Sequence, residues 1–390
     1  MVISIKRWSL LAAAVVGVGS LAACGSSGNS GSADSSGSST NAASAATVIN
    51  ATAAELQKTS GKLSSTAFCG TKKIKLGIHD GLGINAWSKA SYAVVRSEAA
   101  RCPNVTQIVG AGGGDVQKTI SDINGMVAQG INALVAIPDF GAAQLPALRK
   151  ATQAGVKVIA WAAAPGGSAG SDYLDYVDWN QKVAGQRWME WMAKAIDDKG
   201  NIVFLGGPPG TSVSQDELSG IKEELANHPN IKLLTGTKNY AITNWDPAQA
   251  QKTMSALLAK YPKIDGAIID YGASAEGAIR AFQQANRPLI PIGTTEGNSL
   301  GCTFKKLKPA NPKFEMATFS SRNWLGRVAA RKAIAAAAGV SDKEPSIFEL
   351  SLLEDSLAGT PPKCDPSQGP DTAFSSAITP AELSKYGNTK

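Results

Sequence analysis

From residue 71 onward, two patterns of apolar residues alternate along the chain. Short apolar runs bounded by glycine or polar residues predict buried strands, and apolar residues three or four positions apart predict helices. The predicted strands are Lys73–Ile78, Val105–Val109, Ala133–Ile137, Lys157–Trp161, Tyr173–Val177, Asn201–Leu205, Ile231–Gly236, Gly266–Asp270, Leu289–Gly293 and Glu315–Phe319. The predicted helices are Ala86–Arg101, Val116–Gln129, Ala142–Ala154, Gln181–Ile196, Val213–Ala226, Pro247–Lys260, Ser274–Gln284 and Trp324–Ala337.

Strands and helices that alternate at this spacing predict an α/β fold, with parallel sheets covered by helices on both faces. So many strands exceed what one sheet commonly holds, and the alternation begins again after Val177. We therefore predict two similar doubly wound parallel-sheet lobes. In such lobes the ligand crevice lies at the carboxyl ends of the strands.

The start of the chain follows a different pattern. Lys6 and Arg7 precede an apolar run, Leu10–Val18, which is shorter than the roughly 20 residues that span a bilayer and fits the core of a secretory signal. The tetrapeptide Leu21-Ala22-Ala23-Cys24 resembles the bacterial lipobox. The resemblance implies that residues 1–23 are a lipoprotein signal peptide and that Cys24 is lipidated and acylated. The alternative is an ordinary signal peptide followed by a free cysteine.

Residues 24–65 are predicted to form a lipid-anchored Ser/Gly-rich tether. From Gly25 to Ala46 the sequence has almost no charge and few large apolar side chains, so it cannot bury enough surface to order itself. A short helix is predicted around Ala53–Lys58.

Composition narrows the function classes. Of 390 residues, 43% are hydrophobic and 18% charged, as in ordinary soluble globular proteins. The 38 Lys and Arg exceed the 31 Asp and Glu only modestly, and no basic cluster of the kind that binds nucleic acid occurs. The two histidines form no motif with the cysteines, so neither a metal nor a cofactor is predicted.

Four cysteines follow Cys24, namely Cys69, Cys102, Cys302 and Cys364. An even number in an exported protein predicts two disulfides, for which three pairings exist, and four buried free thiols are the alternative.

The chain from Lys73 to about Ala337 resembles the type I periplasmic sugar-binding proteins, the ribose-binding-like solute receptors of ABC importers. The segments that carry the resemblance are Asn85-Ala86-Trp87, Ile137-Pro138-Asp139, Gly155-Val156-Lys157-Val158-Ile159, Asp178-Trp179-Asn180, Gly210-Thr211-Ser212 and Gly277-Ala278-Ile279-Arg280-Ala281. The family implies two lobes joined by a three-strand hinge, with crossovers near Tyr176–Asn180, Ser320–Arg322 and Leu350–Glu354. It places residues 70–177 plus 322–350 in the N-terminal lobe and 178–321 plus 351–390 in the C-terminal lobe. On this topology we expect the disulfides Cys69–Cys102 and Cys302–Cys364.

Planar polar and aromatic side chains near strand ends are the candidate ligand contacts. They are Asn85, Trp87, Asp139, Trp161, Trp179, Gln215, Trp245, Asp270, Tyr271, Glu296 and Arg322. Trp87 and Trp245 fall where the family places stacking aromatics. Two roles stay open for three positions: Trp161 lines the cleft or packs in the core, Asp139 faces the cleft or caps a helix, and Arg322 contacts the ligand or forms a hinge salt bridge.

Two departures from the family concern the ligand. Members that bind pentoses or hexoses carry Asp-Arg after the fourth strand, where this chain has Ala162-Ala163, and Gln215 stands where a second arginine is usual. Both differences argue against simple ribose or galactose and favour a larger, less polar or aromatic ligand.

The resemblance implies an extracytoplasmic solute-binding lipoprotein, anchored to the cell membrane by lipid. As a monomer and not an enzyme, it would bind a sugar, polyol or sugar derivative and deliver it to ABC permease subunits. The alternatives are a receptor for a sensor kinase or chemoreceptor, and a binder of an aromatic or amphipathic solute. Gly81–Ala86 matches a relaxed dinucleotide fingerprint but lacks the following acid, and Gly206–Ser212 lacks the lysine of a phosphate-binding loop.

Overall fold

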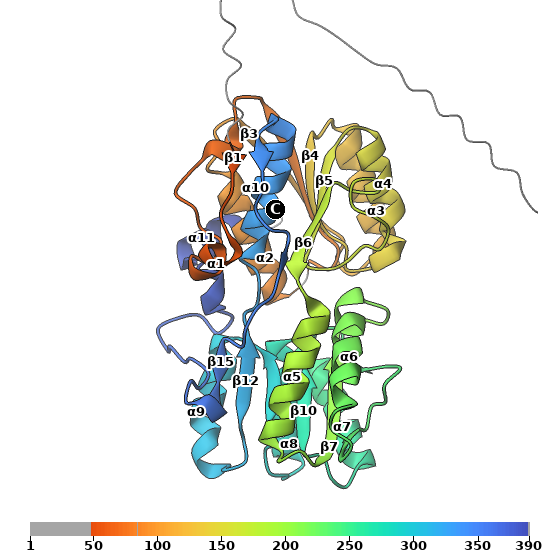
Figure 1. The fold of residues 1–390 in the computed structure, drawn as a ribbon, viewed down its shortest axis with the longest axis vertical. Coiled ribbons are helices and arrows are strands. Elements are labelled where there is room, and N and C mark those ends of the chain that lie inside the picture. Colours follow the sequence, from red (N-terminus) through yellow and green to blue (C-terminus); the bar gives the residue numbers. More distant parts are fainter. Residues whose placement is uncertain (1–47, 84, 389–390) are drawn as a thin grey trace, which may run out of the picture. The chain divides into compact units, whose positions relative to one another are not determined.

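The computed structural model describes residues 48–83 and 85–388. The predicted signal peptide, the lipidation site Cys24 and the tether up to residue 47 lie outside these residues. Within them, no helix has the length and apolar character that crossing a membrane requires. The described chain forms two α/β lobes, each built on one sheet (Figure 1).

The N-terminal lobe has a six-stranded sheet whose strands are all parallel. Its order is β14 (Ile347–Phe348), β6 (Asp175–Trp179), β5 (Lys157–Trp161), β4 (Ala133–Ile137), β2 (Ile74–Asp80) and β3 (Val105–Ala111). One face is covered by α2 (Ala86–Ala99) and α10 (Leu325–Ala338), the other by α3 (Val116–Ala128) and α4 (Leu145–Gln153). β4 is buried at every position, as a central parallel strand must be.

The C-terminal lobe repeats this plan. Its sheet runs β15 (Glu354–Asp355), β12 (Met316–Phe319), β11 (Ile292–Thr295), β10 (Gly266–Ile269), β7 (Gly200–Gly206) and β8 (Ile231–Leu233), with β9 (Ala241–Ile242) paired to β7 and β15 antiparallel to β12. One face is covered by α5 (Gln181–Ala195) and α6 (Ser212–Leu225). The other is covered by α7 (Pro247–Lys260), α8 (Gly272–Gln284) and α9 (Asn298–Leu307).

The chain passes between the two sheets after β6, after β12 and after β14. These are the connections of the predicted three-strand hinge, so the predicted fold class is confirmed.

The bounds of β4, β5 and α7 match the sequence prediction. β6 lies two residues later than predicted because Asp175–Val177 pairs with β5 and Asp178–Trp179 with β14. β11 also lies later, at Ile292–Thr295, and α9 was not predicted.

Both predicted disulfides are confirmed. Cys69 pairs with Cys102 at the start of β2 and β3, and Cys302 on α9 pairs with Cys364. The first joins neighbouring strands of one lobe, and the second ties the C-terminal segment to the other lobe.

The predicted tether is too long at its C-terminal end. β1 (Val48–Ile49) pairs with β13 (Ser341–Asp342), and α1 (Ala53–Lys58) forms as predicted and buries Leu56 completely. The fully buried Arg331 of α10 donates to the Gly61 carbonyl at 2.8 Å and pairs with Glu344 at 2.7 Å. Residues 48–65 are therefore part of the N-terminal lobe.

The C-terminal tail also differs from the prediction, which placed residues 351–390 wholly in the C-terminal lobe. Residues 361–388, here called the strap, leave that lobe at Cys364 and end in α11 (Pro380–Tyr386) against α2 of the N-terminal lobe (Figure 1). Arg327 of α10 donates to the Ser376 carbonyl at 2.7 Å, and Arg96 of α2 donates to the Tyr386 carbonyl at 3.0 Å. The strap is thus a fourth connection between the lobes.

Candidate ligand-binding cleft

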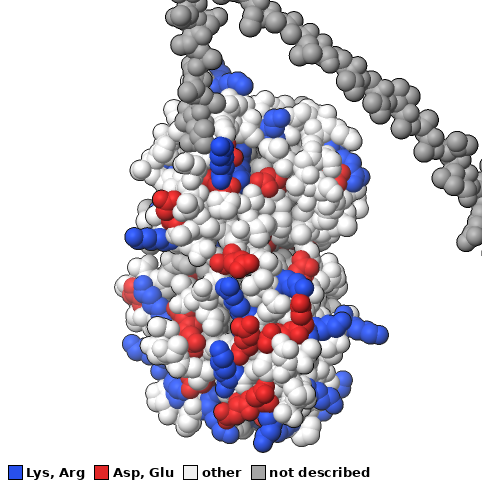
Figure 2. Space-filling model, in the orientation of Figure 1, with Lys and Arg blue, Asp and Glu red and all other residues white. Residues whose placement is uncertain are grey.

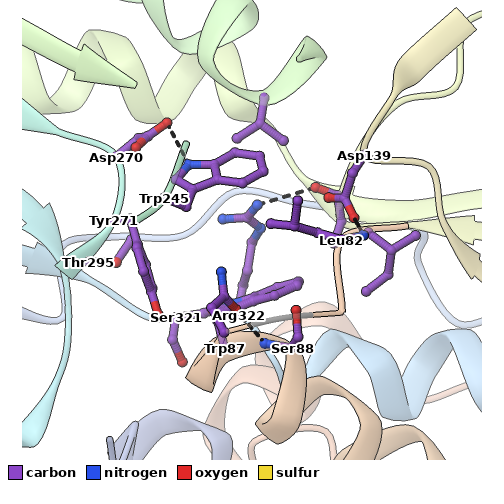
Figure 3. A pocket seen from close by; sticks show the side chains of 14 residues that line it. Leu82, Trp87, Ser88, Asp139, Trp245, Asp270, Tyr271, Thr295, Ser321 and Arg322 are labelled. Atoms are coloured by element: carbon purple, nitrogen blue, oxygen red, sulfur yellow. Dashed lines mark hydrogen bonds between the residues drawn. The ribbon is translucent and has the colours of Figure 1, made fainter. Parts of the chain in front are cut away.

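The carboxyl ends of both sheets face a cavity between the lobes, with about 520 Å³ of empty space including the part open to solvent. Most ligand sites of this size are concave, apolar and fitted with a few aimed polar groups. The N-terminal lobe contributes Leu82, Asn85, Trp87, Ser88, Ile137, Asp139 and Ala162; the C-terminal lobe Val213, Trp245, Asp270, Tyr271 and Thr295; and the hinge Ser321 and Arg322 (Figure 3). The structure therefore brings together seven predicted contacts: Asn85, Trp87, Asp139, Trp245, Asp270, Tyr271 and Arg322.

Arg322 lies in the second hinge connection, between two tryptophan rings. Its guanidinium carbon is 5.6 Å from the centre of the Trp87 ring and 5.3 Å from that of Trp179. Nη2 donates to the Ala162 carbonyl at 3.2 Å, and Nε is 3.2 Å from Asp178 Oδ1, an ion pair without hydrogen-bond alignment. The hinge salt bridge thus forms, and the same arginine also lines the cavity.

Two carboxyl groups meet in the wall of the N-terminal lobe. The Leu82 amide donates to both Asp80 Oδ1 at 3.0 Å and Asp139 Oδ2 at 2.8 Å, and the Gly83 amide donates to Asp80 Oδ1 at 2.8 Å. Burial, and then the neighbouring Asp80, raise the pKa of Asp139 well above its usual value, so we expect this pair to retain a proton. The amides of Leu82 and Gly83 thus donate to carboxyl groups, and the Gly81 amide donates to the Ile137 carbonyl, so none of the three is available to a dinucleotide phosphate.

Asp270 lines the cavity, and one of its carboxylate oxygens is buried without a partner among the described residues. All three of its donors bind Oδ2, namely Ser214 Oγ at 2.6 Å, Trp245 Nε1 at 3.0 Å and the Gly207 amide at 3.1 Å, and Oδ1 has no partner among the described residues. Burial raises the pKa of Asp270 to about 6 despite these hydrogen bonds. A ligand hydroxyl that donated to Oδ1 would satisfy this acceptor.

The aromatic walls are held in place by specific contacts. Trp87 stacks on Trp161 with ring centroids 5.8 Å apart and donates from Nε1 to the Ser321 carbonyl at 2.7 Å. Trp245 has a φ of 52° and packs over Gly207, where an added Cβ would lie 2.3 Å from the indole ring. Only glycine at 207 leaves room for Trp245 in this position.

Four predicted contacts lie outside this cavity. Trp161 and Trp179 are buried at 2% exposure, the first beneath Trp87 and the second edge-on against Phe319. Gln215 is on the exposed side of α6, because the helical period turns Val213 and Ser214 inward instead. Glu296 is buried and accepts from the amides of Ser321 at 2.9 Å and Ser375 at 3.0 Å, so it links the hinge to the strap.

The sequence pattern missed several residues of the cavity wall. They are Leu82, Ser88, Ile137, Ala162, Val213, Thr295 and Ser321. Most of them adjoin a predicted strand end or helix start, a position that could have suggested them. As small or apolar residues, however, they give no chemical signal of their own. The described residues include no group of three or more His, Cys, Asp or Glu arranged to hold a metal ion.

Surface charge adds no second class of site on the visible face of the molecule. Figure 2 shows basic and acidic side chains interspersed there, without a continuous basic area. Such a pattern is typical of solvated surfaces rather than of surfaces that bind nucleic acid.

A family model described as the periplasmic binding protein domain matches residues 80–341. The chain is 28% identical over 221 residues to the xylitol-binding protein of Mycolicibacterium smegmatis, covering 55% of this chain and 61% of that protein. It is 27% identical over 216 residues to the D-xylose-binding periplasmic protein of Escherichia coli, covering 54% and 63%. The matched region thus spans about three fifths of these relatives.

Solved structures show the same fold. A Mycobacterium smegmatis protein in complex with β-D-fucofuranose has a TM-score of 0.63 at 21% identity, with 73% of this chain and 93% of that chain covered. A galactofuranose-binding protein has a TM-score of 0.62 at 20% identity, with 81% and 99% covered.

A family match over more than half of the sequence, together with two lobes around a lined cleft, defines the class. The chain belongs to the periplasmic binding protein family. The two relatives are named for the binding of xylitol and of D-xylose.

Proposed function

We propose that this protein is the extracytoplasmic solute receptor of an ABC importer and binds a sugar, a polyol or a sugar derivative in the cleft between its lobes. The observation that carries the proposal is the cavity itself. It combines a free carboxylate oxygen on Asp270, the buried guanidinium of Arg322 and the rings of Trp87 and Trp245. Hydroxyl groups match such acceptors and donors, and the C–H face of a sugar ring matches an aromatic face.

The two relatives named for xylitol and D-xylose support a small polyhydroxylated ligand. The apolar side of the cavity, formed by Leu82, Ile137 and Val213, supports one that also has a sizeable apolar face. An apolar wall is consistent with the absence of the Asp-Arg pair, whose place in this chain is taken by Ala162-Ala163.

Ligand capture would proceed by hinge closure. The ligand enters between open lobes, binds one wall first and then favours the closed arrangement, in which both walls contact it. Arg322 is placed to sense closure because it belongs to the hinge, contacts Ala162 of one lobe and lines the cavity. The closed lobes would then dock on the permease.

Lipid anchoring at Cys24, delivery to permease subunits and a monomeric state complete the proposal. The two disulfides agree with an oxidising, extracytoplasmic location. The lipobox-like tetrapeptide supports attachment to a membrane.

The test is calorimetry and thermal shift of the full chain against sugars, polyols, nucleosides, amino acids and aromatic acids. We expect one sugar or polyol class to bind. Trp245→Ala should then weaken binding by about tenfold or more, because it removes a stacking surface and a partner of Asp270. The matched control is Gln215→Ala, on the exposed side of α6, which should bind normally. Binding of aromatic acids alone would contradict the proposal.

A further inference from the structure

A second cavity lies next to the first, on the strap side of the cleft. It encloses about 480 Å³ of empty space including the part open to solvent. Trp87, Tyr271, Thr295 and Ser321 line both cavities, so the two cavities adjoin and share part of their walls. Pro370, Asp371 and Ala373 of the strap form the outer wall. Of the predicted ligand contacts, Trp87, Tyr271 and Glu296 line this second cavity.

The walls of the second cavity carry negative charge only. Glu276, Glu296 and Asp371 line it, and no Lys, Arg or His does so among the described residues. The charge of Glu296 is met by donors from Ser321 and Ser375. Glu276 is compensated only weakly, by Arg280 at 3.9 Å, and Asp371 forms no ion pair within the described chain.

Two buried polar atoms beside these acids have no partner among the described residues, Asn323 Oδ1 and Ser321 Oγ. Asn323 is fully buried and donates from Nδ2 to the Trp87 carbonyl at 3.1 Å and to Ser91 Oγ at 3.0 Å. Because its amide donors are already used, the free atom is the acceptor. A buried acceptor without a donor is costly, and a donor-bearing ligand group would satisfy it.

The aromatic ring of Tyr271 favours a cation over a neutral donor. Tyr271 lines the cavity, and aromatic faces attract ammonium groups. Burial raises the pKa of Glu276 above its usual value, and the charge of Asp371 adds to the effect. A bound cation would lower the pKa of Glu276 again, because it favours the ionised carboxylate.

We propose that this second cavity binds a protonated amine of the ligand, so that the solute is an amine-bearing polyol or sugar whose hydroxylated part occupies the first cavity. The inference rests on the proposed function and narrows it. Two carboxylates, a free amide acceptor and the ring of Tyr271 together form the recognition set of an ammonium group. A neutral sugar would leave Asp371 without a counter-charge and Glu276 with only the distant Arg280.

The experiment compares matched neutral and cationic probes by titration calorimetry of the full chain at neutral pH. The probe sets are xylitol with 1-amino-1-deoxyxylitol, and D-glucitol with 1-amino-1-deoxy-D-glucitol and its N-acetyl derivative. We expect at least one amine to bind about tenfold or more tightly than its parent, as charge-assisted hydrogen bonds allow. The N-acetyl derivative, which has lost the charge, should lose that advantage.

The variant Glu276→Gln/Asp371→Asn should reduce the amine-to-parent affinity ratio to near one. The ratio is measured within each variant, so general damage to the fold cancels. The control Glu190→Gln/Asp197→Asn removes two exposed carboxylates from α5 and its following turn and should preserve the ratio.

Parent polyols that bind as tightly as every amine would overturn the ammonium site and leave the proposed function standing. A ratio that survives in the Glu276→Gln/Asp371→Asn variant would also overturn it. Binding of no polyol and no amine would overturn both proposals. Binding of amines alone would support the second cavity and contradict a receptor for neutral sugars.

Discussion

Asp270 is the residue whose protonation should control ligand affinity. Its carboxylate accepts hydrogen bonds more strongly than the protonated acid does, and its pKa is raised to about 6. Affinity should therefore rise with pH up to about 6 and level off above it, with a slope of at most about tenfold per pH unit below. Calorimetry at pH 5, 6 and 7.5 measures this slope. The asparagine side chain of Asp270→Asn does not titrate. This variant should therefore bind more weakly, and its affinity should not show the pH slope.

The stability of the ligand-free protein should change in the opposite direction. Folding raises the pKa of Asp270 from an ordinary 3.8 to about 6, so the folded state holds the proton more tightly between these values. Stability from this group is then highest below pH 4 and falls by about 3 kcal/mol on the way to pH 6. Urea unfolding across this range should show the loss in the wild type and a smaller loss in Asp270→Asn. An equal loss in both proteins would assign the effect to other carboxyls.

Arg322 should be required for the fold as well as for the cleft. Asp178 is fully buried, and burial raises its pKa while Arg322 acts to lower it. Arg322→Met leaves that carboxylate without its cation, which should cost about 3–5 kcal/mol of unfolding free energy. The double variant Arg322→Met/Asp178→Asn should recover most of the loss in urea unfolding, because it removes the unpaired charge. A single variant as stable as wild type would show that Tyr176 and Gln181, which both donate to Asp178, suffice to stabilise it.

At the scale of elements, the strap depends on one side chain of α9. Asn298 Nδ2 donates to the carbonyls of Asp365 at 2.9 Å, Gln368 at 3.2 Å and Gly369 at 3.0 Å, and Oδ1 accepts from the Asp365 amide at 2.9 Å. Asn298→Ala should weaken this attachment by about 3 kcal/mol, at roughly 1 kcal/mol for each of the two Nδ2 hydrogens and for the bond that Oδ1 accepts. Hydrogen exchange over residues 365–372 should quicken, with the disulfide Cys302–Cys364 still formed. Ser367→Ala, which removes only a local bond to Asp365, is the control, and unchanged exchange in Asn298→Ala would contradict the assignment.

Elements differ in how well the sequence predicted them, and the cause is the range of their contacts. β4 and α7 follow from local signals, because Gly130 and Pro138 bound the strand and Asp246 caps the helix with Pro247 at its first position. The register of β6 depends on pairing with β14, which lies far along the chain. Gln215 was placed correctly at a helix start but assigned to the wrong face of α6. The strap has few long apolar runs, so no periodic pattern marks its path across both lobes.

At the scale of the whole molecule, the strap should bias the equilibrium between open and closed lobes. It is fixed to the C-terminal lobe at Cys364 and Asn298 and to the N-terminal lobe through Ser376 and α11. A fourth connection of this kind restricts how far the lobes can separate. Less conformational entropy is therefore lost when the ligand closes the lobes.

Removal of residues 379–390 should therefore enlarge the ligand-free protein and weaken ligand binding. Without α11 the open population grows, and the apparent affinity falls with the binding-competent fraction, by about threefold to tenfold. Small-angle scattering measures the radius of gyration with and without ligand, and calorimetry measures the affinity. Arg96→Ala tests the same contact in the full chain, because it removes the donor to the Tyr386 carbonyl. It should also increase the radius of gyration and lower the affinity, both by less than the truncation does. If the truncated protein keeps the size and affinity of the full chain, the strap serves only as a wall of the second cavity.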